Sequence, residues 1–445
     1  MIPEKERLIN EKVFRDPVHN YIKVDHPIIL DLINAKEMQR LRHIKQLGTS
    51  SFTFHGSEHS RFTHALGVYE IARKICNVFK CNYPKNSTNK DGWDNSKRLL
   101  TLTSALLHDI GHGAYSHTFE HIFNTDHEQF TIDIITFKQT EVFQILHSFA
   151  KDFPKKVAEV IQKTYKNQQV VQIISSQIDA DRMDYLLRDA YYTGTKYGTF
   201  DLTRILRTIR PVKGGIAFKA SGMHAVEDYI ISRYQMYMQV YFHPTSRAME
   251  IILKHLLKRA CTLYQKMPAY FKQTTPFLLP FLKGKYKLKD YLCLNDDVLN
   301  TYFAEWKQAK DFILSDLAKR FLDRKPLKSC AYLNKDKPII DEMKKLVAAV
   351  GFDPDYYTAL NSSYDLPYDF YRPNTKNTYT QIEIMQKNGQ LKELSTMSPL
   401  VFALAGNSHG DQRFYFPKEM LDNSLTSKFN KEIKKFNQLF SSVQN

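Results

Sequence analysis

Histidine and aspartate stand on the apolar faces of predicted helices, and this placement constrains the fold more than any other feature. Apolar residues recur at helical spacing over residues 68–79, and His64 continues that stripe toward the N-terminus. Asp181 follows Ile174 by seven positions and Ile178 by three, so it also lies in phase with an apolar stripe. Buried imidazoles and carboxylates are costly unless something compensates them. The pattern therefore predicts helices packed around a polar centre.

A further pair of polar residues ends another amphipathic helix. His108 and Asp109 are adjacent, and the glycines that follow predict the end of the helix. Any one of these residues alone is more often a satisfied core side chain. Together they form the pattern H-x43-HD-x71-D, whose two imidazoles and two carboxylates (His64, His108, Asp109 and Asp181) suit a divalent cation. The sequence predicts one such ion per subunit, and it leaves Mg, Mn, Fe, Zn and Ni open.

Outside this centre the chain predicts a mostly α protein in two parts. Residues 14–24 predict a short β-hairpin around an asparagine-containing turn, and helical periodicity dominates from there to about residue 265. A polar break follows at residues 267–280, and then a helical stretch at 296–322. Asn388-Gly389 predicts a second hairpin, with another strand at 413–416. We expect a helical catalytic core at residues 1–265 and a smaller α+β C-terminal lobe at 266–445, serving regulation and oligomerisation.

The charge balance points to polyanionic partners. Lys and Arg number 63 against 47 Asp and Glu, a net charge of +16, which favours nucleotides or nucleic acid. Nucleic acid is the secondary expectation, because no basic run is interleaved with aromatic residues. The five cysteines are scattered and indicate free thiols. No segment reaches the apolar length of a membrane span. We therefore expect a cytoplasmic protein that does not associate with membranes.

Five strings carry a resemblance to a known family. They are residues 16–19 (D-P-V-H), 39–48 (Q-R-L-R-H-I-K-Q-L-G), 59–68 (H-S-R-F-T-H-A-L-G-V), 107–117 (L-H-D-I-G-H-G-A-Y-S-H) and 179–189 (D-A-D-R-M-D-Y-L-L-R-D). On these strings the chain resembles the HD-domain phosphohydrolases. More narrowly, it is similar to the deoxynucleoside triphosphate (dNTP) triphosphohydrolases related to the vertebrate sterile-alpha-motif and HD-domain protein, without the sterile-alpha module. The C-terminal lobe matches only weakly.

The resemblance implies an HD-domain fold and a reaction that converts a dNTP and water into a deoxynucleoside and tripolyphosphate. The four predicted metal ligands keep that role. His117 would act on the leaving 5′-oxygen, held by Glu120, while His112 and His127 would face the phosphates. The spacing of His117 and Glu120 puts both on one helix face, although such a pair is otherwise an idle surface ion pair. The implied substrate-binding residues are Gln46, Leu47, Arg61, Arg182, Tyr185, Asp189, Arg233 and Tyr241.

The same resemblance implies a second nucleotide site between subunits. Its positions would be Lys12, Val13, Arg15, Asn34, Gln39, Arg42, Arg210, Arg324 and Lys328. Asn34 stands where the vertebrate relative has an aspartate that reads guanine, and Arg15 replaces an asparagine. A guanine-specific switch is therefore not implied, whereas another nucleotide activator remains open. By resemblance, we expect a homotetramer built as a dimer of dimers.

Two other interpretations stay open. The same centre serves a phosphohydrolase acting on a cyclic nucleotide or a guanosine polyphosphate. Alternatively, the chain is a nucleic-acid-binding regulatory protein with a vestigial centre, as its positive charge suggests. Three predicted phosphate-clamping arginines (Arg61, Arg182 and Arg233) favour a long phosphate chain. The complete ligand set argues against decay of the centre.

Overall fold

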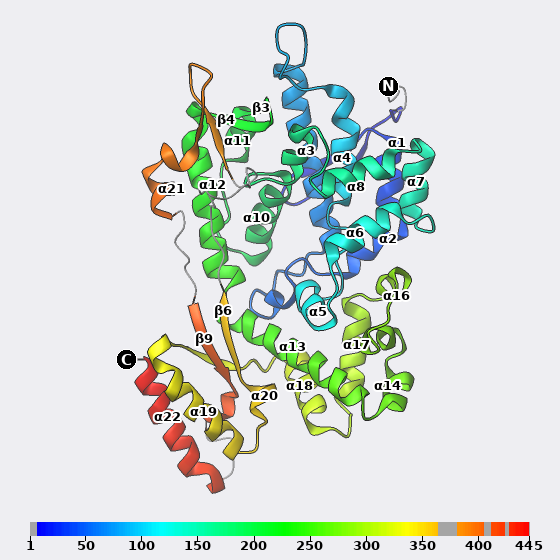
Figure 1. The fold of residues 1–445 in the computed structure, drawn as a ribbon. Coiled ribbons are helices and arrows are strands. Elements are labelled where there is room, and N and C mark those ends of the chain that lie inside the picture. The colour runs from blue at the N-terminus through cyan, green and yellow to red at the C-terminus, as the bar shows by residue number, and fades with distance from the viewer. Residues whose placement is uncertain (1–6, 364–380, 405–410, 423–426, 445) are drawn as a thin grey trace.

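The protein is mostly helical, with small sheets beside the helices (Figure 1). The computed structural model describes residues 7–363, 381–404, 411–422 and 427–444. The described part confirms the predicted fold class, including a hairpin near the N-terminus. That hairpin pairs β1 (Lys12–Asp16) with β2 (Asn20–Val24) antiparallel, and Asn20 takes a left-handed conformation with φ 66° at the turn.

A first core occupies the larger helical part and contains the predicted apolar stripes. Its central helix, α3 (Arg61–Asn82), buries Val68, Ile71, Ile75 and Phe79. The helices around it are α1 (Pro27–Asn34), α2 (Lys36–Arg40), α4 (Arg98–Leu107), α6 (His127–Thr136), α7 (Glu141–Phe149), α8 (Phe153–Ile161), α9 (Gln168–Ile174), α10 (Ala180–Thr193), α11 (Leu202–Thr208) and α12 (Met223–Met236).

A second core lies below the first in Figure 1 and is built mainly on α13 (Pro244–Tyr264). A π-helical segment, Tyr237–Tyr241, joins α12 to α13, which begins at Pro244. The other helices of this part are α5 (Ser116–Phe123), α14 (Pro268–Thr274), α15 (Leu279–Leu282), α16 (Leu288–Leu292), α17 (Asp296–Trp306) and α18 (Phe312–Leu322). The polar break predicted at residues 267–280 was wrong: Phe271 and Leu278 are buried there, so short helices form.

The C-terminal part mixes helices and strands as predicted. Strand β9 (Asp411–Phe416) lies between β5 (Lys328–Ala331) and β6 (Ala359–Ser363), antiparallel to both. Helices α19 (Lys337–Ala349) and α22 (Asn430–Gln444) lie beside this sheet and share a third core with it (Figure 1). Two short helices follow in the chain: α20 (Pro354–Tyr357) packs on the second core, and α21 (Pro399–Leu404) packs on the first core.

The predicted Asn-Gly hairpin is confirmed and returns to the first core. It joins β7 (Glu383–Met385) to β8 (Leu391–Glu393). Strand β7 pairs in parallel with β4 (Gly215–Lys219), which pairs with β3 (Ile209–Val212). The division of the chain at residue 265 stays a prediction. The cores suggest another place for it, because α13 precedes residue 265 and yet belongs to the second core.

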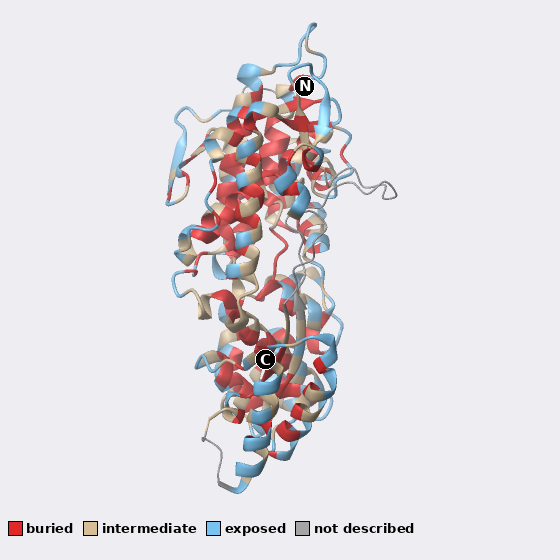
Figure 2. Cartoon of the chain, turned by 90° about the vertical axis from the view of Figure 1, so that its left-hand side faces the viewer, coloured by how far each residue is buried: buried red, intermediate tan, exposed pale blue. Residues whose placement is uncertain are grey.

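Burial follows these cores. Figure 2 shows buried positions through the interior of both parts and exposed positions along the outer loops. All five cysteines are free thiols, as expected. None of the described helices combines the length and apolar composition needed to cross a bilayer.

Candidate active site

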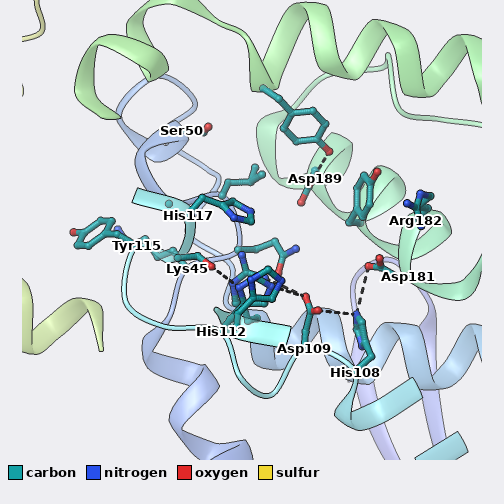
Figure 3. A pocket seen from close by; sticks show the side chains of 18 of the residues that line it. Lys45, Ser50, His108, Asp109, His112, Tyr115, His117, Asp181, Arg182 and Asp189 are labelled. Atoms are coloured by element: carbon teal, nitrogen blue, oxygen red, sulfur yellow. Dashed lines mark hydrogen bonds and ion pairs between the residues drawn. The ribbon is translucent and has the colours of Figure 1, made fainter. Parts of the chain in front are cut away.

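A cavity of about 740 Å³ opens where the first and second cores meet. Its walls come from the segment after α4, the start of α10, the π-helical segment and residues 45–50. Figure 3 shows Asp109 between His112 and His108, with Asp181 on the far side of His108. Histidines and carboxylates from distant stretches of the chain therefore converge on one cavity.

The four predicted metal ligands meet at one end of this cavity. His64 lies in the first turns of α3 and His108 directly follows α4, while Asp181 lies in the first turn of α10. His64 Nε2 is 3.1 Å from Asp181 Oδ1, and His108 Nε2 is 3.5 Å from both Asp181 Oδ1 and Asp109 Oδ1. The ligand atoms of His64, His108 and Asp109 lie within 4.8 Å of one another. The structure thus brings the predicted quartet together.

The hydrogen bonds of this quartet leave lone pairs facing lone pairs. His64 Nδ1 donates to Asp184 Oδ2 at 2.8 Å, and His108 Nδ1 donates to the Ala105 carbonyl at 3.0 Å. In neutral rings both Nε2 atoms are then acceptors turned toward carboxylates. His108 Nε2 is buried and has no hydrogen-bond partner. Such an arrangement needs a positive charge at its centre.

The raised pKa of His64 also indicates that this centre favours a positive charge. Burial disfavours its charged form, yet hydrogen bonds to Asp181 and Asp184 raise the pKa of His64 to about 10. Asp109 commits Oδ2 to Arg61 at 3.2 Å and to His112 Nε2 at 3.1 Å, which leaves Oδ1 for an ion. A divalent cation therefore fits the donor set of His64, His108, Asp109 and Asp181.

The segment after His108 turns sharply because Gly111 packs against α6. A Cβ on Gly111 would lie 2.3 Å from the His127 carbonyl oxygen and 2.3 Å from the Thr131 nitrogen. The close approach brings the start of α6 beside the segment that carries His112. As a result the rings of His112 and His127 stack at 3.9 Å.

These two histidines belong to a second cluster, which includes His117 and Glu120 on α5. Glu120 Oε1 accepts from His127 Nδ1 at 2.7 Å, and Glu120 Oε2 accepts from His117 Nδ1 at 3.3 Å. His112 Nδ1 contacts the Ser116 hydroxyl. His117 and His127 line the cavity, whereas Glu120 lies behind them. The predicted His117–Glu120 pair is present, but His127 is the nearer partner of that carboxylate.

Within this cluster the histidines differ in charge. Burial, with Arg61 nearby, lowers the pKa of His112 to about 3, so this ring is neutral at physiological pH. Burial also opposes charge on His127, but the hydrogen bond to Glu120 outweighs it and raises the pKa of His127 above its usual value. The pKa of Glu120 is lowered despite partial burial, because His117 and His127 donate to it.

Two of the three predicted arginines line the cavity. Arg61 reaches it beside Asp109, and Arg182 contacts Asp179 at 2.5 Å from the start of α10. Arg233 stands behind the wall, where its Nη1 donates to Gln177 Oε1 at 2.8 Å, and Gln177 itself lines the cavity. The direct phosphate contact predicted for Arg233 stays a prediction.

The predicted sugar-binding residues line another wall of the cavity: Gln46, Leu47, Tyr185, Asp189 and Tyr241. Tyr241 donates to Asp189 Oδ2 at 2.6 Å, and His59 Nε2 contacts Asp189 Oδ1 at 2.9 Å. Gln46 Oε1 is buried and has no hydrogen-bond partner. The π-helical segment brings both Tyr237 and Tyr241 to the cavity, and π turns are frequent at functional sites.

Sequence reasoning missed several lining residues. Lys45, Lys163 and Arg247 add positive charge to the cavity, and Tyr237 and Phe242 add aromatic surface. Single lysines and arginines carry no local signal that separates them from solvated surface charge. Tyr237 and Phe242 lie within an aromatic run, whose usual explanation is core packing.

The positions predicted for a second nucleotide do not form one site within a subunit. Arg210 lies on β3 at the upper end of Figure 1, and Arg324 follows α18 at the lower end. Arg15 contacts Asn20, and Arg42 contacts Gln39. Lys12, Val13, Asn34 and Lys328 are exposed. A site between subunits stays a prediction.

Comparisons with known proteins agree with this geometry. Residues 61–189 match the HD domain, and residues 200–273 match the HD associated region. The uncharacterized protein YwfO of Bacillus subtilis is 50% identical over 93% of this chain and 94% of its own length. The deoxynucleoside triphosphate triphosphohydrolase SAMHD1 homolog of Dictyostelium discoideum is 26% identical over 55% of this chain, and the match spans 48% of that protein.

A solved structure shares the fold. The phosphohydrolase from Bacteroides thetaiotaomicron superposes with a TM-score of 0.76 at 24% identity, covering 91% of this chain and 99% of its own. The HD domain match includes His64, His108, Asp109 and Asp181, the residues that converge on the cavity. This chain belongs to the HD-domain phosphohydrolases, with an HD associated region after the HD domain.

Proposed function

We propose that this protein is a metal-dependent dNTP triphosphohydrolase, which releases a deoxynucleoside and intact tripolyphosphate. The distribution of charged and aromatic residues in the cavity is the main support for this proposal. One end holds the metal-ligand quartet and basic side chains, and another wall presents tyrosines with an Asp189 carboxylate. A nucleoside triphosphate has the matching polarity, with an anionic chain at one end and a hydroxylated sugar beyond it.

The residues near the metal ligands suit hydrolysis at phosphorus. A bound divalent ion would supply Lewis-acid stabilisation and a water of lowered pKa. Arg61 and Arg182 neutralise non-bridging oxygens, since guanidinium groups bind phosphate through paired hydrogen bonds. His112 is neutral, and its contact with Asp109 holds that carboxylate in place.

The second cluster suits protonation of the leaving oxygen. The side chain of His117 is 72% exposed and lines the cavity, so a substrate oxygen can reach it. Glu120 orients this ring and also accepts a hydrogen bond from His127, whose pKa is raised. General acid catalysis needs a titratable donor held by a carboxylate, and this pair provides one.

The preference for deoxyribose rests on the sugar wall. Tyr241 is held toward Asp189 by its hydroxyl, and the rings of Tyr185 and Tyr241 meet edge to face at 6.3 Å. In this proposal, the aromatic wall packs against the sugar and excludes an added 2′-hydroxyl. The name of the Dictyostelium relative, a deoxynucleoside triphosphate triphosphohydrolase, supports the same substrate class.

Product analysis tests the proposal. Purified protein loaded with Mn²⁺ is incubated with each dNTP, singly and in pairs, and the phosphates are separated by ion-exchange chromatography. We expect tripolyphosphate from at least one dNTP and much slower release from the matching ribonucleotide. Pairs reveal an activating nucleotide that no single dNTP exposes. Only orthophosphate or pyrophosphate in every mixture would reject the triphosphohydrolase and return attention to other nucleotide substrates.

A further inference from the structure

A buried network of charged side chains lies directly behind the metal ligands. Asp184, on α10 one turn after Asp181, accepts from His64 Nδ1 at 2.8 Å. It also contacts His19 Nε2 at 2.6 Å and accepts from Arg188 Nε at 2.9 Å and Nη2 at 3.0 Å. Both oxygens of Asp184 are therefore fully engaged.

The network continues into the N-terminal hairpin. Arg188 donates through Nη1 to Asp16 Oδ2 at 2.8 Å, and Asp16 is the last residue of β1. Asp16 Oδ1 accepts the backbone N–H groups of Val18 at 2.9 Å and His19 at 2.8 Å. The hairpin turn thus reaches His64 by two routes, one through His19 and one through Arg188.

The burial of this network sets it apart from surface ion pairs. The side chains of Asp184 and Arg188 have no exposed area, and that of His19 has 1%. A buried ion pair is weak evidence for stabilisation, because well-packed apolar side chains often serve as well. Orientation of the metal ligand His64 is a better account of why charged groups occupy this place.

A glycine on α3 leaves room for the network. Gly67 lies one turn after His64, and a Cβ there would lie 1.9 Å from Asp184 Oδ1 and 2.4 Å from Arg188 Nη2. The carboxylate and guanidinium therefore pack directly against the backbone of the helix that carries His64. This contact fixes their position independently of the hydrogen bonds.

We propose that His19 and Asp184 are positioning residues that set the metal affinity of the centre. Asp184 holds His64 with its proton on Nδ1 and its Nε2 lone pair toward the ion, and His19 fixes Asp184 from the hairpin turn. Carboxylates behind metal-bound histidines commonly act in this way. The inference rests on the metal centre of the proposed function and not on its dNTP substrate.

Metal titration tests this inference. Chelator-treated protein is titrated with Mn²⁺, and free Mn²⁺ is measured by electron paramagnetic resonance for the wild type, His19→Gln, Asp184→Asn and the control His255→Gln. His255 is a buried histidine on α13 that contacts the Tyr356 carbonyl. We expect the Mn²⁺ dissociation constant to rise by about 10–100-fold in the first two variants. The control should bind like the wild type.

The outcomes separate this inference from the proposed function. A folded His19→Gln variant that binds Mn²⁺ as tightly as the wild type overturns the positioning role and leaves the metal centre intact. Absence of Mn²⁺ binding in the wild type overturns the metal centre itself. Far-ultraviolet circular dichroism reports folding of each variant. If Asp184→Asn does not fold, His19→Gln decides alone, because in that variant Asp184 keeps its hydrogen bonds from His64 and Arg188.

Discussion

Two clusters of histidines and carboxylates lie side by side in this protein, and their hydrogen bonds differ in kind. In the first, the Nε2 atoms of His64 and His108 face the carboxylates of Asp109 and Asp181. In the second, each contact pairs a donor with an acceptor, as where His127 donates to Glu120. Similar residue types at similar distances therefore form two different hydrogen-bonding arrangements.

This difference in hydrogen bonding distinguishes the proposed metal centre from the proposed proton-transfer cluster. With neutral rings, an acceptor-only arrangement is unfavourable until a metal ion or a proton enters, whereas a paired arrangement is complete as it stands. Both clusters meet a simple distance criterion for metal binding. The positions of the protons distinguish the two clusters, and this distinction can be tested.

The largest effect is expected from removing a ligand of the first cluster. Asp181→Ala should abolish Mn²⁺ binding and lower the turnover of dNTP on the order of 10³-fold, because the ion supplies several kcal/mol of transition-state stabilisation. Binding is measured by Mn²⁺ titration and turnover by tripolyphosphate release. Asp201→Ala is the matched control, since Asp201 caps α11 away from the cavity. Normal binding in Asp181→Ala would falsify the assignment of the quartet.

A smaller effect is expected from the second cluster. His117→Gln should lower the turnover number by about 10²-fold, because a positioned general acid contributes on that order. Its Mn²⁺ affinity should match the wild type, which is the feature that separates the clusters. His121→Gln, one helical turn along α5 and in contact with Lys254, is the control. A loss of Mn²⁺ affinity in His117→Gln would show that the second cluster also takes part in metal binding, contrary to this assignment.

The support behind the first cluster is tested by Gly67→Ala. In an ordinary helix this change is stabilising by up to about 1 kcal/mol. Here the added methyl group meets Asp184 and Arg188, so the free energy of unfolding should instead fall by about 1–3 kcal/mol. Urea unfolding measures the change. An increase in stability would show that the network tolerates displacement.

The two clusters should also respond to pH in opposite directions. His112 has a pKa of about 3, so below pH 6.5 the unfolded chain binds a proton that the folded chain does not. Stability should therefore fall toward pH 3, by at most about 1.4 kcal/mol per pH unit. In metal-free protein the pKa of His64 is about 10, so its contribution is complete below pH 6.5 and is lost as pH rises toward 10.

Urea unfolding of chelator-treated protein across this range measures both slopes. His112→Gln should flatten the acidic slope and His64→Gln the alkaline slope, each relative to the wild type. If both variants changed the same limb of the profile, the distinction between the clusters would be lost.

Local patterns predicted much of this molecule. The helical phase of His64 and Asp181 predicted inward-facing side chains; His64 is buried and Asp181 lines the cavity, and the Asn388-Gly389 turn located a hairpin. These signals are local, since periodicity and turn chemistry act over a few residues. The short helices at residues 267–280 were not predicted, because the buried apolar residues there, Phe271 and Leu278, stand among Pro and Thr residues.

Contacts between distant residues could not be predicted in the same way. The short contact between His127 and Glu120 depends on how the segment at Gly111 packs against α6. Asp16, His19 and Arg188 lie within the strings that carry the family resemblance. Their network with Asp184 appears only in three dimensions. The unpaired Nε2 of His108 likewise follows from the final packing.

The parallel pairing of β4 with β7 has a consequence for synthesis on the ribosome. Phe218 faces Ile384, and Leu394 and Val401 complete the same core. The first core therefore leaves the ribosome with one sheet edge bare and its interior unfinished until the residues after 380 have been translated. A nascent chain stalled before residue 380 would present that bare edge to its neighbours, where strand-to-strand aggregation begins.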